Sequence, residues 1–327
     1  MRWGIAGFGW VARDYMAPAM AAAGGKVAGI ADPSPLAQAS AMSASIIAYD
    51  DVAMMLADAN IDALYVATPN HLHRPMVEIA AAAGVSVLCE KPLAATLDDA
   101  EAMAAAVAKS GILFGTAFDQ RHHPAHVALR DAIGANRIGT PTAVRIVYCC
   151  WVGPDWSAAN WRADAAAAGG GAGIDLALHG LDLAQFLIGE EIVLLDMMVQ
   201  RRIHSYGVED GAMLTARTES GVLVSIHVAY NCPEALPRRR LEVVGLTGAL
   251  EATDTMGQTP GGTVVLRCGT SGESAVLAFD TTLSPFTCQV SAFEAAVRGE
   301  EHDFDIKRDL WLMRLFDAAY RKALACL

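Results

Sequence analysis

Short apolar runs alternate with alanine-rich helical stretches over the first 118 residues, and this alternation restricts the fold more than any other feature of the chain. Short apolar runs bounded by turn residues are typical of buried strands, and strands that alternate with helices form a parallel sheet covered by helices. The expected strands are residues 3–6, 27–31, 46–48, 63–67, 85–89 and 112–118. The sequence therefore predicts an α/β fold in which a first domain, residues 1–119, contains a doubly wound parallel sheet.

The pattern changes after Gln120. Polar and apolar residues alternate over 212–218, 222–230 and 241–244, which is typical of antiparallel strands with one polar face. A long strand over 142–151 and an irregular, tryptophan-containing loop are also expected, together with helices near 124–133, 173–188, 285–298 and 306–324. We therefore predict a second, α+β domain, residues 120–327, with a large, mostly antiparallel open sheet.

The charge of the chain excludes two classes of partner. The 24 basic and 36 acidic residues give a formal net charge of −12, so nothing attracts a nucleic-acid backbone or an anionic membrane. The sequence has no run of about 18 uncharged apolar residues and begins without a signal-type cleavage site, so we expect a cytoplasmic protein. Seven cysteines lack C-x-x-C spacing and lie mostly in apolar runs, so we expect them to be reduced thiols in the core.

The segment that follows the first strand has the G-x-G-x-x-A form of a dinucleotide-binding turn, Gly7-Phe8-Gly9-Trp10-Val11-Ala12. In such a turn the first glycine allows a tight bend, the second lets the backbone approach a pyrophosphate, and the small third residue permits close packing of helix and strand. The N-terminus of the helix presents N–H groups to the anion. An ordinary glycine-rich turn is the alternative, but the position between a strand and a helix favours nucleotide binding.

Asp32 follows the second strand, twenty residues after Ala12. A carboxylate at this position accepts hydrogen bonds from the adenosine ribose hydroxyls and repels a 2′-phosphate, so it favours NAD over NADP as the cofactor. The alternative is structural, because Asp32 precedes Pro33-Ser34-Pro35 and could cap the next helix. NADP is kept as the alternative cofactor.

Candidate catalytic side chains lie in two further segments. Lys91, in a Glu-Lys-Pro turn, follows the fifth strand at the sheet edge where ligands of α/β sheets bind, although a solvated surface loop has the same composition. Asp175 and His179 are four residues apart on an apolar helix entered through a glycine run, and Asp182 is expected on the same face. Polar groups on a buried helix need partners or a ligand; a hydrogen-bonded core histidine is the alternative.

Two other clusters are interpreted as structural. The three arginines at 238–240 are expected to be a solvated turn that leads into a strand. His122, His123 and His126 lack a clear acidic partner, so no metal site is predicted.

Four segments taken together, residues 7–12, 67–73, 90–92 and 169–179, resemble the Gfo/Idh/MocA family of glucose–fructose and inositol-type oxidoreductases, in the family's order and over nearly the whole chain. The resemblance implies a Rossmann domain and a second domain whose open sheet commonly forms homodimers or homotetramers. It implies Lys91, Asp175 and His179 as catalytic and substrate-binding residues, with the nicotinamide ring near the Glu-Lys-Pro turn. The implied cofactor-binding residues, with those of the glycine turn and Asp32, are Gly7, Phe8, Gly9, Trp10, Val11, Ala12, Asp32, Thr68, Pro69, Asn70, His73, Glu90, Lys91, Trp161 and Arg162.

Two segments depart from the family pattern. Ala177 replaces a glycine often seen between the aspartate and the histidine, and residues 119–124 differ from the usual segment with arginine and phenylalanine. Trp161-Arg162 and residues 207–211 give some resemblance to the 1,5-anhydro-D-fructose reductases, a group that typically prefers NADP. The substrate therefore stays open.

The function expected from the resemblance is hydride transfer between nicotinamide and a hydroxyl-bearing or carbonyl carbon of a sugar, sugar derivative or cyclitol. We expect His179 to exchange the hydroxyl proton and Lys91 to stabilise the alkoxide, and the two could exchange roles. Two alternatives remain at this point: a non-catalytic cofactor-binding sensor or repressor, and an enzyme with tightly held NAD that is recycled at each turnover.

Overall fold

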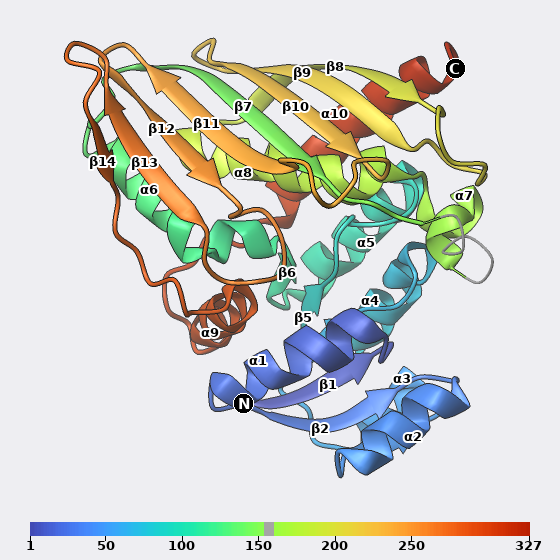
Figure 1. Cartoon of the computed structure of the whole chain (residues 1–327). Helices are drawn as coiled ribbons and strands as arrows, with labels where there is room; N and C mark the ends of the chain where they lie inside the picture. Colours follow the sequence, from blue (N-terminus) through green and yellow to red (C-terminus); the bar gives the residue numbers. More distant parts are fainter. Residues whose placement is uncertain (154–159) are drawn as a thin grey trace. The chain divides into compact units, whose positions relative to one another are not determined.

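The computed structural model describes residues 1–153 and 160–327, and the chain divides into two compact units (Figure 1). The first unit comprises residues 1–117 and 286–310, and the second comprises residues 118–285 and 311–327. The expected domain change near residue 119 thus lies close to the first junction. Part of the tryptophan-containing loop, residues 154–159, lies outside the described residues.

The first unit contains a six-stranded sheet with the order β3-β2-β1-β4-β5-β6, and every pair in it is parallel. The strands are β1 (Arg2–Ala6), β2 (Lys26–Ala31), β3 (Ile47–Tyr49), β4 (Ala63–Val66), β5 (Ser86–Cys89) and β6 (Phe114–Thr116). Its helices are η1 (Ala12–Met16), α1 (Ala17–Ala22), α2 (Pro35–Ser43), α3 (Val52–Asp58), η2 (Asn70–Leu72), α4 (His73–Ala82), α5 (Leu97–Ser110) and α9 (Pro285–Val297). This topology confirms the predicted Rossmann-type sheet.

Local signals in the sequence explain where these elements begin and end. The side chain of Thr96 accepts a hydrogen bond from the Asp99 N–H at the start of α5, as an N-cap residue does. Gly111 ends the same helix in the left-handed conformation, with φ of 70°, which glycine adopts at little cost. The sheet itself is stable because apolar side chains such as Trp3, Ile5 and Tyr65 are fully buried around it.

The prediction placed residues 285–298 in the second domain, and the structure corrects this. Helix α9 packs on the first unit, where Phe286, Val290 and Phe293 join the core cluster that contains Trp3. The Trp3 Nε1–H also donates to Glu294 Oε1 at 2.8 Å. The spacing of these apolar residues indicates that the helix has one buried face, but spacing carries no information about which distant strand that face will cover.

The second unit contains an eight-stranded sheet with the order β14-β13-β12-β11-β7-β10-β9-β8. Its strands are β7 (Pro141–Cys149), β8 (Ile192–Gln200), β9 (Gly211–Thr218), β10 (Leu223–Ala229), β11 (Arg239–Gly245), β12 (Gly248–Thr253), β13 (Thr263–Cys268) and β14 (Ser274–Val276). Strands β7 and β10 pair in parallel and the remaining neighbours pair antiparallel. The predicted large, mostly antiparallel sheet is therefore confirmed.

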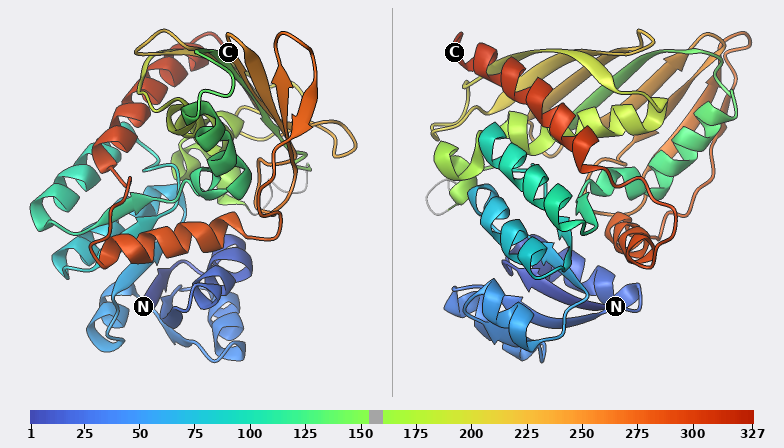
Figure 2. Two further views of the ribbon diagram at one scale, coloured as in Figure 1. Left: turned by 90° about the vertical axis from the view of Figure 1, so that its left-hand side faces the viewer. Right: turned by 180° about the vertical axis from the view of Figure 1, so that it is seen from behind.

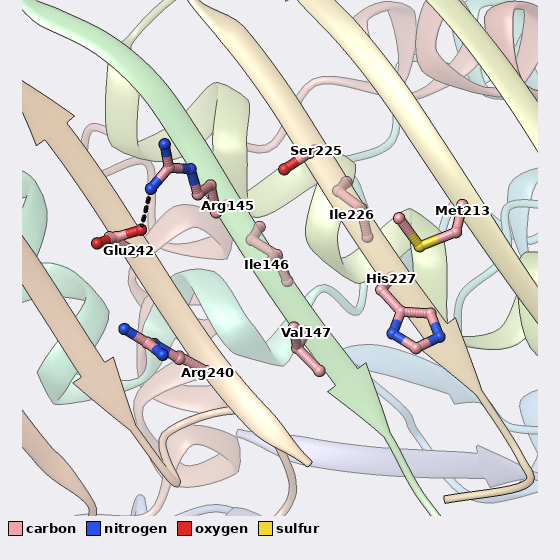
Figure 3. Close-up of a pocket in the computed structure, with 9 residues that line it drawn as sticks. All are labelled: Arg145, Ile146, Val147, Met213, Ser225, Ile226, His227, Arg240 and Glu242. Atoms are coloured by element: carbon pink, nitrogen blue, oxygen red, sulfur yellow. Dashed lines mark hydrogen bonds and ion pairs between the residues drawn. The ribbon is translucent and has the colours of Figure 1, made fainter. Parts of the chain in front are cut away.

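Helices cover one face of this sheet and leave the other open. They include η3 (Asp119–His122), α6 (Pro124–Gly134), η6 (Gly173–Ala177) and α8 (Leu178–Ile188), and Figure 2 shows the sheet edge-on with the described helices of this unit on one side. Helix α8 approaches closely, since a Cβ atom on Gly180 would lie 3.2 Å from side-chain carbons of Ile226. The open face carries polar side chains such as Arg145 and Glu242 around a hollow, together with Met213 (Figure 3).

Three further observations concern the whole described chain. Among the described residues, no helix combines the length and apolarity needed to cross a membrane. Within the same residues, no group of three or more His, Cys, Asp or Glu side chains is arranged to hold a metal ion. None of the seven cysteines, all of which lie among the described residues, forms a disulfide, and Cys268 and Cys326 are exposed rather than in the core.

Candidate functional site

The glycine turn between β1 and η1 has the backbone geometry that a dinucleotide requires. Gly7 has φ of +83°, and a Cβ atom there would lie 2.8 Å from the backbone of Ala67, so only glycine fits. A Cβ atom on Gly9 would meet no described atom within 4 Å, so this part of the turn faces open space. Ala12 is fully buried, which lets η1 pack closely on the strand.

Asp32 connects the glycine turn to the end of β2. Its Oδ2 accepts a hydrogen bond from the Phe8 N–H at 2.7 Å, and its Oδ1 accepts from the Ser34 N–H at 2.9 Å. The second bond holds the turn before α2, but the N-cap position of that helix is Ser34, so Asp32 stabilises the turn and does not cap the helix. The first bond places the carboxylate beside the glycine turn, where a ribose of a dinucleotide binds in this fold.

His73 joins the turns that follow β4 and β5. The imidazole is fully buried, with Nδ1 3.0 Å from the Pro92 carbonyl oxygen and Nε2 3.1 Å from the Thr68 carbonyl oxygen. Burial lowers the pKa of His73 to about 4, and so the ring is neutral and donates its one N–H to one of these carbonyls. We interpret His73 as a residue that positions the cofactor-lining turns rather than one that contacts the cofactor.

Lys91 lies at the carboxyl end of β5, between two anchored neighbours. On one side, the Tyr65 hydroxyl donates to Glu90 Oε1 at 2.5 Å, and on the other the Pro92 carbonyl faces His73. The carboxyl ends of parallel strands form the ligand-binding edge of such a sheet. The ammonium group therefore comes from a rigid turn at the edge where a bound nicotinamide would lie.

These residues of the first unit fit a dinucleotide. The open space at Gly9, the N-terminus of η1 and the carboxylate of Asp32 supply the pyrophosphate and ribose contacts that the fold requires. In the described part of the chain the buried hydroxyl of Thr68 has no hydrogen-bond partner, which leaves a polar atom in the turn after β4 for a ligand. Asn70, two residues after Thr68, is also buried. Trp10, in the glycine turn, is 43% exposed.

In the second unit, Asp175 and His179 lie on successive turns of η6 and α8. The Asp175 Oδ2 accepts a hydrogen bond from the Tyr230 hydroxyl at 2.7 Å. His179 as a whole residue is 6% exposed, and the rings of Phe118 and Tyr148 meet its imidazole edge-on at centroid distances of 6.3 and 5.8 Å. His179 is thus buried among aromatic rings, whereas Asp175 is half-buried and held by Tyr230.

Asp182 was expected to lie on the same face as Asp175 and His179, but its carboxylate is engaged elsewhere. The Arg121 Nε–H points to both carboxylate oxygens, at 2.8 and 2.7 Å, and both side chains are almost fully buried. Asp182 therefore neutralises a buried arginine and is a structural residue. The sequence pattern could not reveal this pairing, because Arg121 is 61 residues away.

Trp161 and Arg162 form the short helix η5 (Trp161–Ala163), next to the residues that are not described. The Asn160 side chain caps it by accepting from the Arg162 N–H at 3.1 Å, and the Arg162 guanidinium lies over the indole of Trp161 at 4.4 Å. The positive charge of Arg162 also acts on Tyr230, where it opposes the rise in pKa caused by burial and by Asp175. Arg162 is thus close to the cluster formed by Asp175, His179, Tyr148 and Tyr230.

Sequence analysis missed the two tyrosines of this cluster. Tyr148 comes from the end of β7 and Tyr230 from the segment after β10, and both are nearly fully buried. Burial raises the pKa of both phenols, and nearby carboxylates raise it further, so both stay neutral hydrogen-bond donors. No sequence signal could have identified them, because only the parallel pairing of β7 with β10 brings them to one edge.

Glu209 explains why the helix with the catalytic candidates begins with a glycine run. Its carboxylate accepts hydrogen bonds from the N–H groups of Gly171 and Gly173, each at 2.9 Å, and from the Tyr320 hydroxyl at 2.6 Å. A Cβ atom on Gly171 would collide with the Glu209 carbonyl oxygen. Burial raises the pKa of Glu209 and these bonds oppose that rise. The segment 207–211 therefore anchors the start of η6.

Comparison with known proteins agrees with this geometry. Residues 1–118 match the oxidoreductase family with an NAD-binding Rossmann fold, and residues 126–251 match the GFO/IDH/MocA C-terminal domain. The chain is 35% identical over 301 residues to a 1,5-anhydro-D-fructose reductase of Ensifer adhaerens, covering 91% of this chain and 88% of that protein. It is 29% identical over 327 residues to D-xylose 1-dehydrogenase (NADP(+)) 2 of Haloferax volcanii, covering 99% and 97%.

The fold has a solved counterpart of the same extent. The crystal structure of an aldose-aldose oxidoreductase from Caulobacter crescentus, complexed with glycerol, superposes with a TM-score of 0.87 at 26% identity, covering 100% of this chain and 98% of that one. Both halves of the chain match family descriptions, and the first relative is similar over nearly its full length. The chain belongs to the Gfo/Idh/MocA family of NAD-binding oxidoreductases.

Proposed function

We propose that this oxidoreductase transfers hydride between NAD and a hydroxyl-bearing or carbonyl carbon of a sugar, sugar derivative or cyclitol. The observation that carries the proposal is the cluster of Asp175, His179, Tyr148 and Tyr230, in which a base, a carboxylate and hydroxyl donors lie together. Such a set can bind several hydroxyls of a polyol and move a proton from one of them. The names of the relatives, a sugar reductase and a sugar dehydrogenase, support the same substrate class.

Each catalytic candidate has one role in this proposal. When bound, NAD supplies the hydride chemistry at its nicotinamide ring. His179 takes the proton of the substrate hydroxyl during oxidation and returns it during reduction. The Lys91 ammonium stabilises the negative charge that develops on the substrate oxygen, and Asp175, oriented by the Tyr230 hydroxyl, accepts a hydrogen bond from a second substrate hydroxyl.

The residues proposed to hold NAD follow from the family match and the geometry of the first unit. Backbone N–H groups of the turn from Gly7 to Ala12 bind the pyrophosphate, and Asp32 binds the adenosine ribose. Thr68, Pro69, Asn70 and Glu90 border the nicotinamide half, with His73 behind them. The resemblance to the family adds Trp161 and Arg162 to the cofactor-binding residues.

A direct absorbance assay tests the class of reaction and the choice of cofactor together. Purified protein is mixed with NADH or NADPH and a panel of ketoses, aldoses and oxidised inositols, and absorbance at the nicotinamide band is followed. We expect NADH oxidation with at least one sugar and a lower kcat/KM with NADPH. Binding of both cofactors without turnover on any member of the panel would support the sensor alternative instead.

Replacing Asp32 should change which cofactor is used. In Asp32→Ser the carboxylate that repels a 2′-phosphate is lost while a hydroxyl remains to accept the Phe8 N–H, so we expect the kcat/KM ratio of NADP to NAD to rise by about 10-fold to 100-fold. Asp32→Asn, which keeps the shape and removes the charge, should show part of the change. The ratio is measured with one sugar at saturation. If it is unchanged in both variants, Asp32 does not select the cofactor and only holds the turns through its bonds with Phe8 and Ser34.

A second candidate function is favoured by the likeness to an aldose-aldose oxidoreductase. In that case NAD stays bound and is reduced by one sugar and reoxidised by another within each turnover. Protein purified without added cofactor would then convert a mixture of two sugars with no net change in NADH. Product analysis by chromatography, run beside the absorbance assay, separates the two modes.

We also propose that the protein is a cytoplasmic homo-oligomer, a dimer or a tetramer, whose copies meet through the open face of the eight-stranded sheet. The register places Met198 opposite Met213 and Met213 opposite His227, so these side chains form one row on that face. Met198 and Leu223 are 73% and 60% exposed, which is apolar surface that a second copy would bury. Sedimentation equilibrium gives the mass directly.

A further inference from the structure

We propose that Asp119 is the positioning residue of His179: its carboxylate holds the imidazole through Nδ1, so that Nε2 is the nitrogen that exchanges the substrate proton. The inference rests on the proposed role of His179 and adds to it a partner that the sequence analysis did not assign. Asp119 Oδ1 lies 3.4 Å from His179 Nδ1, and the two side chains are 7% exposed each. This is an ion-pair distance, somewhat longer than that of a formed hydrogen bond, as is common for catalytic pairs without substrate.

The Asp119 carboxylate is itself held in place. The Gln120 side chain donates from Nε2 to Asp119 Oδ2 at 2.9 Å and to the Gly257 carbonyl oxygen at 3.2 Å, and Gln120 is fully buried. One carboxylate oxygen is thus bound to the amide, and the other faces the imidazole. A carboxylate fixed in this way orients a histidine ring more firmly than a mobile one would.

A buried histidine fixes the backbone of this segment. His126 has Nδ1 2.8 Å from the Gln120 carbonyl oxygen and Nε2 2.9 Å from the Thr255 hydroxyl. Burial lowers the pKa of His126 to about 3, so the ring is neutral, donates from Nδ1 to the carbonyl and accepts from the hydroxyl at Nε2. The segment that carries Asp119 is therefore anchored to the core of the second unit.

Asp175 is less suited to the positioning role. Its Oδ2 already accepts from the Tyr230 hydroxyl at 2.7 Å, which turns the carboxylate toward the tyrosine. Two titratable groups face His179 from neighbouring elements in the described residues: Asp119 comes from η3 and Tyr148 from β7. Arg121, also on η3, is neutralised by Asp182. Asp119 Oδ1 faces the ring at 3.4 Å from Nδ1, whereas Asp175 is bound to Tyr230.

The chemistry of the pair follows from this arrangement. During oxidation the bound NAD⁺ would accept the hydride of the carbinol C–H bond, while the O–H proton passes to His179 Nε2 and the carbinol becomes a carbonyl. The imidazole then carries a positive charge, which the Asp119 carboxylate stabilises at Nδ1–H. In the reduction direction the negative charge of Asp119 favours the protonated His179, which donates the proton to the substrate oxygen. The carboxylate does not itself take the proton.

Asp119→Asn tests the proposal, because asparagine keeps the shape and removes the charge. We expect kcat for oxidation to fall by about 10-fold to 100-fold with KM changed less than about 3-fold. We expect the acid limb of the pH profile to move to lower pH by about one pH unit, because a neutral neighbour no longer favours the imidazolium. Thermal unfolding of the variant checks that the fold is kept.

His179→Gln separates the failure of this inference from the failure of the proposed function. If His179→Gln keeps activity, the catalytic role of His179 is wrong; if it is inactive while Asp119→Asn has normal kcat and an unmoved acid limb, only the role of Asp119 is wrong. In the double variant the Asp119 change should have no further effect, since residues that act through one another are not additive.

An NMR titration of the imidazole signals answers the question without any substrate. The His179 signals are identified by their absence in His179→Gln. We expect the wild-type ring to carry its proton on Nδ1 when neutral and to titrate at higher pH than in Asp119→Asn. Identical titration of His179 in both proteins, or a proton on Nε2 in the wild type, would overturn the proposal.

Discussion

The variant Lys91→Met is expected to lower kcat for sugar oxidation by about 10²-fold to 10³-fold while leaving the dissociation constant for NAD within about 3-fold. Methionine keeps the length and apolar part of the side chain and removes the charge that stabilises the substrate oxygen. An electrostatic group aimed at developing charge is worth about 3–4 kcal/mol of transition-state stabilisation. The backbone turn should persist, because Glu90 and Pro92 keep their contacts with Tyr65 and His73.

Steady-state kinetics and a separate measurement of NAD binding by calorimetry give the two quantities. Lys109→Met is the matched control, since Lys109 is an exposed lysine in the last turn of α5 and should leave both unchanged. A kcat for Lys91→Met within 10-fold of the wild type, with NAD binding intact, would remove Lys91 from the catalytic group. A loss of NAD binding alone would make it a cofactor-binding residue.

Removing the guanidinium of Arg121 should have the largest effect on stability. Arg121 and Asp182 are 6% and 1% exposed at their side chains, with Nε 2.7 Å from Oδ2. In Arg121→Met the Asp182 carboxylate stays buried without its cation, so we expect the free energy of unfolding to fall by about 3–5 kcal/mol. The Arg121 guanidinium also lies over the Phe186 ring at 5.4 Å, a contact that methionine replaces only in part.

Urea unfolding followed by tryptophan fluorescence measures the change, with attention to whether the second unit unfolds separately. The double variant Arg121→Met with Asp182→Leu should recover part of the loss, because no uncompensated charge is then buried. Arg321→Met is the control, as its pair with Asp317 lies one turn apart on α10 (Ile306–Leu324) with the arginine 67% exposed. A loss as small for Arg121→Met as for Arg321→Met would contradict the expectation.

Local sequence patterns were sufficient for the first sheet and its cofactor turn. The strands of the first unit are short, apolar and separated by helices, so their order follows from one rule of α/β topology. The G-x-G-x-x-A turn is equally local, since Gly7 is required by its own φ and by contact with Ala67. The positions of Lys91 and of the helix with Asp175 and His179 also follow from elements that the sequence defines.

The partners of these residues were not predictable, because they come from distant parts of the chain. Tyr230 reaches Asp175 only because β10 pairs in parallel with β7 inside a mostly antiparallel sheet, and no composition signals that pairing. The pairing of Asp182 with Arg121 was not predictable for the same reason, since helical periodicity indicates a face but not which charge lies opposite. The contact of Asp119 with His179 likewise joins a short helix at the domain change to a helix 60 residues later.

The packing of α9 on the first unit has a consequence for folding during synthesis on the ribosome. Trp3 is made first, but the Glu294 carboxylate that accepts its indole N–H, and the phenylalanines around it, emerge 291 residues later. At a synthesis rate of roughly 5–20 residues per second, the residues that bury the indole are made roughly 15–60 s after Trp3. The nascent Rossmann sheet therefore leaves the exit tunnel with an apolar gap, and the first unit can be completed only after residues 118–285 of the second unit have been synthesised.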